Sequence, residues 1–178
     1  MFKHAGFAVA LVIGGSVSAY AGPFTNKNKL GDLMMVMSPA YALGMTVMAD
    51  DPDGTVQLAE SVVVAQLASE GIKAFGLERR PNGTDRKSFP SGHAAGAFSG
   101  AMFVHKRYGW KPALLPYAMS AVAGWSRVQA RAHYWHDVAA GAAVSALFTW
   151  VFVDEYVPKG VDVSADTQSV RVGFSTEF

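Results

Sequence analysis

Long stretches of this chain contain no charged side chain, and this feature limits the folds that it can adopt. Residues 33–49 and 138–153 are 17 and 16 residues long and contain no Asp, Glu, Lys or Arg. Each run lies within a helix that capping and turn residues predict. Both runs are shorter than the roughly 20 residues that usually cross a bilayer. The sequence therefore predicts an all-α protein, a compact bundle of five to six helices that is soluble or leans on a membrane surface. A six-helix membrane form stays open.

Turn and capping residues divide the chain into five predicted helices. Asp32 is a candidate cap for the first helix, in which Pro39 predicts a kink or a later start. Beyond residue 158, Val170, Val172 and Phe174 alternate with polar residues, as in a short strand. We expect residues 158–178 to form a C-terminal extended tail that packs on the bundle or pairs with a partner's edge. The predicted helices cover about residues 33–49, 55–75, 91–108, 112–128 and 132–153.

The first 21 residues have the pattern of a secretory signal peptide. Lys3 and His4 give a short basic start, residues 7–18 are apolar and small, and residues 19–21 offer a small-x-small cleavage site. The alternative is a retained first membrane helix. Either interpretation predicts a protein that is periplasmic or exported, possibly associated with the inner membrane, with one helical domain over residues 22–157.

Charge and cysteine content exclude several classes of protein. The chain has no cysteine, which excludes disulfides, thiolate phosphatases and cysteine zinc sites. After residue 21 it carries 14 basic and 14 acidic residues, which does not favour nucleic-acid binding. Between Lys73 and Arg131, however, ten residues are basic and only Glu78 and Asp85 are acidic. This local excess indicates a focused anion site.

Two short patterns place histidines where they could do chemistry. Ser91-Gly92-His93 stands at a predicted helix start, where backbone N–H groups and the helix dipole attract an anion, and glycine allows close approach. His133 and Asp137 lie four residues apart at the start of the predicted fifth helix and share a face. A carboxylate there can keep one imidazole nitrogen protonated and leave the other as a nucleophile. Each pattern alone also fits an ordinary capped helix or a surface ion pair.

Three cations come from separate segments, Lys73, Arg80 and Arg127. Buried cations in an apolar protein need an anionic partner, although each of these alone also fits a solvated loop. Together they match the charge on the three equatorial oxygens of a transferring phosphoryl group.

In this order and spacing, these residues resemble the type 2 phosphatidic acid phosphatase family, whose active site is shared with bacterial non-specific acid phosphatases and vanadium haloperoxidases. The three matching signatures are Lys73-x6-Arg80-Pro81, Pro90-Ser91-Gly92-His93 and Ser126-Arg127-x5-His133-x3-Asp137.

The resemblance implies a role for each residue. His133 would attack phosphorus and form a phosphohistidine, Asp137 would orient it, and His93 would protonate the leaving oxygen and then activate water. No metal or other cofactor is implied, and vanadate would be an inhibitor. The phosphate oxygens would be held by Lys73, Arg80, Ser91, the Gly92 backbone and Arg127.

The implied function is hydrolysis of phosphate monoesters or pyrophosphates, on a lipid or on a small soluble molecule, near a membrane surface. Two alternatives stay open. One is a vanadate-dependent haloperoxidase, in which vanadate would be the cofactor. The other is an inactive periplasmic lipid-binding protein. The sequence does not indicate an oligomeric state.

Overall fold

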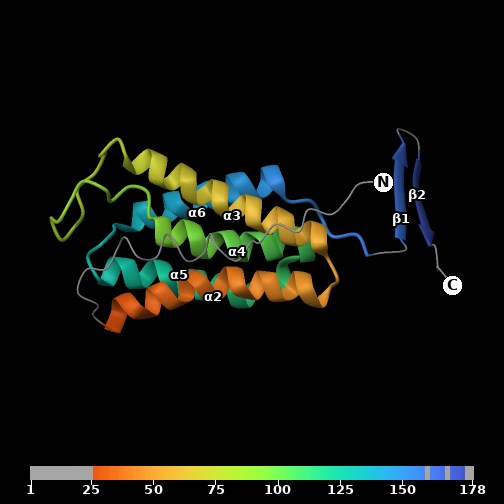
Figure 1. The fold of residues 1–178 in the computed structure, drawn as a ribbon, viewed down its shortest axis with the longest axis horizontal. Coiled ribbons are helices and arrows are strands. Elements are labelled where there is room, and N and C mark those ends of the chain that lie inside the picture. Colours follow the sequence, from red (N-terminus) through yellow and green to blue (C-terminus); the bar gives the residue numbers. More distant parts are fainter. Residues whose placement is uncertain (1–25, 159–160, 167–168, 175–178) are drawn as a thin grey trace.

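The computed structural model describes residues 26–158, 161–166 and 169–174. The predicted signal peptide, residues 1–21, lies outside the described residues. Five α-helices form one bundle, as predicted, and a β-hairpin follows them (Figure 1). The helices are α2 (Asn26–Met48), α3 (Pro52–Lys73), α4 (Gly92–Tyr108), α5 (Trp110–Gln129) and α6 (Trp135–Phe152).

Helix α4 is the centre of the bundle and contacts the other four helices. Its buried face consists mainly of alanine and glycine, which lets the neighbouring backbones come close. At Gly100, a Cβ would stand 2.5 Å from the backbone nitrogen of Pro39 in α2. The larger apolar side chains gather toward the end of α4 where Phe103 and Val104 lie, so the other end is left for polar groups.

Three helix starts differ from the prediction by three residues or more. Helix α3 begins at Pro52, three residues earlier than predicted. Helix α2 begins at Asn26 and continues through Pro39, so Asp32 lies inside the helix and is not its cap. Its carboxylate instead contacts side chains of α4 and α5, which local patterns could not show. Helix α6 begins at Trp135, three residues later than predicted, and His133 therefore precedes the helix.

The tail forms a two-stranded antiparallel hairpin of β1 (Val161–Asp166) and β2 (Ser169–Phe174), with Val161 opposite Phe174. The predicted strand is present, but its partner is the preceding segment of the same chain. In Figure 1 the hairpin lies beyond the end of the bundle, on the side away from the loop that joins α3 to α4.

A buried ion pair holds the end of the bundle nearest the hairpin. Asp51, which caps α3, accepts hydrogen bonds from the Gly54 backbone at 2.9 Å, from Arg107 Nη2 at 2.6 Å and from the Tyr108 hydroxyl at 2.6 Å. Arg107 also donates to the Asp154 carbonyl at 3.1 Å. This network joins α3, α4 and the segment after α6.

We expect Asp51→Ala to destabilise the fold by about 3–5 kcal/mol, because it leaves the Arg107 guanidinium buried and unpaired. Urea denaturation would measure the free energy of unfolding. Asp53→Ala is the matched control, since Asp53 is exposed two residues away. An equal loss in both variants would contradict a structural role for the pair.

Candidate active site

The three predicted segments meet at one end of the bundle. Because helices that follow one another in the sequence alternate in direction, the end of α3, the start of α4, the end of α5 and the start of α6 all lie there (Figure 1). The loop between α3 and α4 covers this end and doubles back on itself, with the Arg80 N–H donating to the Asp85 carbonyl at 3.0 Å. Residues separated by 60 positions in the sequence thus surround one polar site.

His133 is buried, with 2% of its surface exposed. Its Nδ1 lies 2.8 Å from the Ser88 carbonyl oxygen, which can only accept, so Nδ1 carries the proton and Nε2 keeps its lone pair. Nε2 faces Nη1 of Arg80 at 3.4 Å, and the same Nη1 donates to the Ala132 carbonyl at 3.2 Å. Burial lowers the pKa of His133 to about 4, and the positive charges of Arg80 and Lys73 act in the same direction. The imidazole of His133 is therefore neutral, and its basic Nε2 faces the Arg80 guanidinium.

Asp137 supports His133 less directly than the predicted spacing suggests. One oxygen, Oδ2, lies 3.5 Å from His133 Nδ1, accepts from the Ser88 hydroxyl at 2.5 Å and accepts from the Tyr134 backbone N–H at 2.8 Å. Asp137 therefore ties the start of α6 to the loop that carries Ser88. The prediction missed Ser88, whose carbonyl is the nearest partner of Nδ1. Its position two residues before Pro90 offers no local signal.

His93 on α4 contacts a carboxylate that the prediction did not include in the site. Its Nε2 lies 2.9 Å from Asp32 Oδ1, and the same oxygen lies 3.2 Å from Nη1 of Arg127. Burial lowers the pKa of His93, while the hydrogen bond to Asp32 raises it. In the sequence, Asp32 is a single acidic residue directly before the uncharged run 33–49. That position predicts a helix cap and gives no sign of a contact with His93.

The structure brings the three predicted cations together, and each has an acidic neighbour. Lys73 and Arg127 are buried, with 4% and 6% of their surfaces exposed. The pairs are Lys73 with Glu70 at 2.6 Å, Arg80 with Asp85 at 2.9 Å, and Arg127 with Asp32 at 3.2 Å. Carboxylates thus lie beside the cations that an incoming anion would need. A phosphate group would share these cations with carboxylates or displace them.

The start of α4 lies against Lys73. A Cβ on Gly92 would stand 2.7 Å from Lys73 Nζ, so any other residue there would push the ammonium group away from the helix start. Ser91 caps the helix, its hydroxyl accepting from the Ala94 N–H at 3.3 Å and its own N–H donating to the Asp137 carbonyl at 2.9 Å. The backbone at this helix start and the ammonium group of Lys73 thus meet at one point, as an anion site requires.

One group of side chains near the site has the composition of a metal site. The ligand atoms of Glu78, His136 and Asp137 lie within 4.8 Å of one another. His136 Nε2 is 2.7 Å from Glu78 and 3.3 Å from Asp137 Oδ1, a buried oxygen without a hydrogen-bond partner. A protonated His136 between two carboxylates accounts for these distances, and its pKa is raised mainly by the hydrogen bond to Glu78.

Comparisons with known proteins identify the family of this chain. The chain is 33% identical to a lipid A 4′-phosphatase of Helicobacter pylori over 168 residues, which cover 84% of each protein. It is 37% identical over 84 residues to a lipid A 1-phosphatase of Porphyromonas gingivalis, of which it covers 19%. No solved structure matches the chain. The family model described as the PAP2 superfamily matches residues 51–157, which include all three signatures. The chain therefore belongs to the PAP2 superfamily.

Proposed function

We propose that this protein is a metal-independent lipid phosphatase that removes a phosphate monoester from a lipid A-type substrate through a phosphohistidine on His133. The observation that carries the proposal is the position of the His133 ring, whose Nε2 faces Arg80 while its Nδ1 lies against the Ser88 carbonyl oxygen. Both curated relatives are named as lipid A phosphatases, which favours hydrolysis over haloperoxidase chemistry and lipid A over other phosphate esters.

The reaction has two steps. In the first, His133 Nε2 forms a bond to phosphorus while the bond from phosphorus to the ester oxygen breaks, and His93 gives that oxygen its proton. In the second, water attacks phosphorus, its proton passes to His93, and the bond to Nε2 breaks to release phosphate. Lys73, Arg80 and Arg127 stabilise the charge on the phosphoryl oxygens in both steps.

Asp32 acts as a positioning residue in this scheme. Its carboxylate holds the Nε2 proton of His93 at 2.9 Å, and so it favours the charged form that donates a proton to the leaving oxygen. It also holds Arg127 beside His93. Because Asp32 Oδ1 accepts the hydrogen bond from the His93 Nε2–H, the leaving oxygen must replace Asp32 as the acceptor before it can receive the proton.

We expect kcat/KM to have a maximum at acidic pH. His133 attacks only when unprotonated, so activity falls as the pH drops through about 4. His93 donates only when protonated, and because burial lowers its pKa below 6.5, activity also falls as the pH rises past that lowered value. Asp32→Asn removes a group that raises the pKa of His93. It should therefore move the alkaline limb to lower pH and leave the acid limb in place, as kcat/KM from about pH 3 to 9 would show. A shift of the acid limb alone would contradict this role.

The outer surface of the bundle suits a lipid substrate. Among the residues that the structure describes, the helix over Lys29–Met48 is long and apolar enough to cross a membrane, and only 22% of that stretch is buried. Large exposed apolar side chains continue over the other outer helices, among them Leu67, Leu114, Trp135, Leu147 and Trp150. We propose that the protein associates with a membrane and that its active site lies on the exported side.

Phosphate release from a panel of substrates tests the proposed function. The panel contains lipid A, phosphatidic acid, phosphatidylglycerophosphate, prenyl pyrophosphate and nitrophenyl phosphate, presented in the same micelles. We expect lipid A to be hydrolysed fastest, vanadate to inhibit competitively, and a chelator to have no effect. Strong inhibition by the chelator would overturn metal independence, and His136→Ala would then show whether Glu78, His136 and Asp137 hold the metal.

A further inference from the structure

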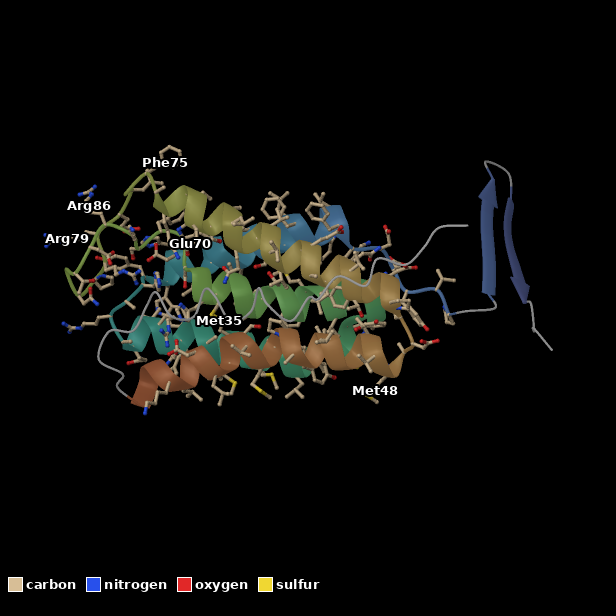
Figure 2. All side chains as sticks on the ribbon, in the orientation of Figure 1. Met35, Met48, Glu70, Phe75, Arg79 and Arg86 are labelled. Carbon is tan, nitrogen blue, oxygen red and sulfur yellow. The ribbon has the colours of Figure 1, made fainter. Side chains whose placement is uncertain are left out.

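Two arginines flank the turn at the tip of the loop between α3 and α4. The Nε and Nη2 of Arg79 donate to the Gly83 carbonyl at 3.2 and 2.9 Å, which holds the guanidinium against this turn. The Arg131 carbonyl accepts from the Asn82 N–H at 2.9 Å, which joins the segment after α5 to the same turn. Both arginine side chains are exposed. Figure 2 shows Arg79 projecting from the loop at the end of the bundle.

The turn directly follows, in the sequence, a residue of the proposed active site. Arg80 follows Arg79 directly, and its guanidinium lies inside the pocket, 3.4 Å from His133 Nε2. The same guanidinium donates to the carbonyl of Ala132, the residue after Arg131, at 3.2 Å. Arg79 and Arg131 are thus the sequence neighbours of two residues of the proposed active site, and both are exposed on its outer side.

The charge on these two arginines is not balanced by nearby acids. In the part of the chain that the structure describes, neither Arg79 nor Arg131 forms an ion pair with a carboxylate. Asp85 is paired with Arg80 at 2.9 Å, and Glu78 is paired with His136 at 2.7 Å. Lys73, Arg80 and Arg127 differ from these two arginines, because each of the three has a carboxylate neighbour. The edge of the pocket thus keeps positive charge available for an external anion.

Arg131 also adopts an uncommon backbone conformation. Its φ is +52°, in the left-handed region that non-glycine residues rarely occupy. Hydrogen bonds hold it there, from its own N–H to the Val128 carbonyl at 3.0 Å and from the Asn82 N–H to its carbonyl. These bonds fix the direction in which the Cβ of Arg131 leaves the backbone.

We propose that Arg79 and Arg131 form a second anion subsite at the edge of the catalytic pocket, which binds a phosphate-type group other than the one that is hydrolysed. The proposal rests on the proposed function, because the scissile phosphate fills the inner pocket. The second anion is either another phosphate of the same substrate or the headgroup of a neighbouring anionic lipid. Guanidinium groups suit both, since they pair with phosphate oxygens through two parallel hydrogen bonds.

The test compares lipid A with two phosphates and monophosphoryl lipid A in neutral detergent micelles, with and without added phosphatidylglycerol. The variant is Arg79→Ala/Arg131→Ala. The matched control is Lys111→Ala, which removes an exposed cation from the first turn of α5, at the opposite end of the bundle. Thermal unfolding checks that both variants are folded.

If the second phosphate of the substrate is the ligand, the double variant raises KM about tenfold for the diphosphorylated lipid and leaves KM for the monophosphorylated lipid unchanged. If neighbouring headgroups are the ligand, phosphatidylglycerol lowers KM for the monophosphorylated lipid in the wild type and not in the double variant. In both cases kcat stays within about twofold, because the subsite lies outside the reacting atoms.

A double variant whose KM values match those of Lys111→Ala on every lipid would overturn the subsite. Binding of the same lipids to His133→Ala, with and without the arginine changes, gives an answer that needs no turnover. If the wild type releases no phosphate from any lipid, the proposed function fails. The subsite is then judged by whether the arginine changes weaken binding of the diphosphorylated lipid, or of the monophosphorylated lipid with phosphatidylglycerol.

Discussion

Replacing His133 by alanine is expected to lower kcat for phosphate release by at least about 10⁴-fold, because it removes the atom that bonds to phosphorus. The loss should be equal for good and poor leaving groups, since without the nucleophile neither ester is cleaved. The phosphoenzyme should also disappear. To measure the phosphoenzyme, the protein is mixed with labelled substrate, quenched rapidly without acid and separated on a gel. Acid is avoided because phosphohistidine is stable to base and labile to acid.

Stability and specificity need separate controls for His133→Ala. The ring is buried and bonded to Ser88, so the thermal midpoint of the variant is measured beside that of the wild type. His105→Ala is a matched histidine control, because His105 lies on α4 and its Nδ1 pairs with the Tyr117 hydroxyl at 2.9 Å. A folded His133→Ala protein that still forms a labelled phosphoenzyme would show that another residue is the nucleophile.

Replacing His93 by alanine should have the second largest effect, and its size should depend on the leaving group. For an alkyl phosphate such as lipid A, the leaving oxygen needs a proton, and we expect kcat to fall by about 10²–10⁴-fold. For nitrophenyl phosphate, whose leaving group departs as an anion, the first step should hardly change. Because His93 also activates water, the phosphoenzyme should then accumulate after one turnover.

Accumulation of the phosphoenzyme distinguishes loss of a catalytic group from a general distortion of the active site. A burst of nitrophenol equal to the enzyme concentration, followed by slow release, is the expected time course for His93→Ala. An equal fall in rate for both substrates without a burst would contradict its role as acid and base. Asp32→Asn should cause a smaller loss of the same kind, since it acts on the leaving oxygen only through His93.

Much of this protein could be predicted from local patterns. Both uncharged runs lie in predicted helices, and the turn at residues 50–54 and the glycine after Tyr108 placed the ends of three helices within a few residues. The three signatures identified the residues that the fold gathers at one end. Signatures can do this because each one joins residues only a few positions apart, whose spacing reflects one turn, one helix start or one short loop.

The partners of these residues could not be predicted in the same way. The expected pairing of His133 and Asp137 assumed that both lie on one helix, whereas α6 begins after His133 and leaves the Ser88 carbonyl as the nearest acceptor. Asp32 appeared to be a helix cap, and only the packing of α2 against α4 and α5 shows that it contacts His93 and Arg127.

The residues that the fold gathers at one end of the bundle could thus be predicted along the chain, because hydrophobic periodicity, capping and motif spacing depend on neighbours within about one or two helical turns. Which nitrogen of each histidine carries the proton depends on a group 45 or 61 residues away, the Ser88 carbonyl for His133 and the Asp32 carboxylate for His93. Those groups meet only after the helices pack, since burial and charge pairing depend on distance in space.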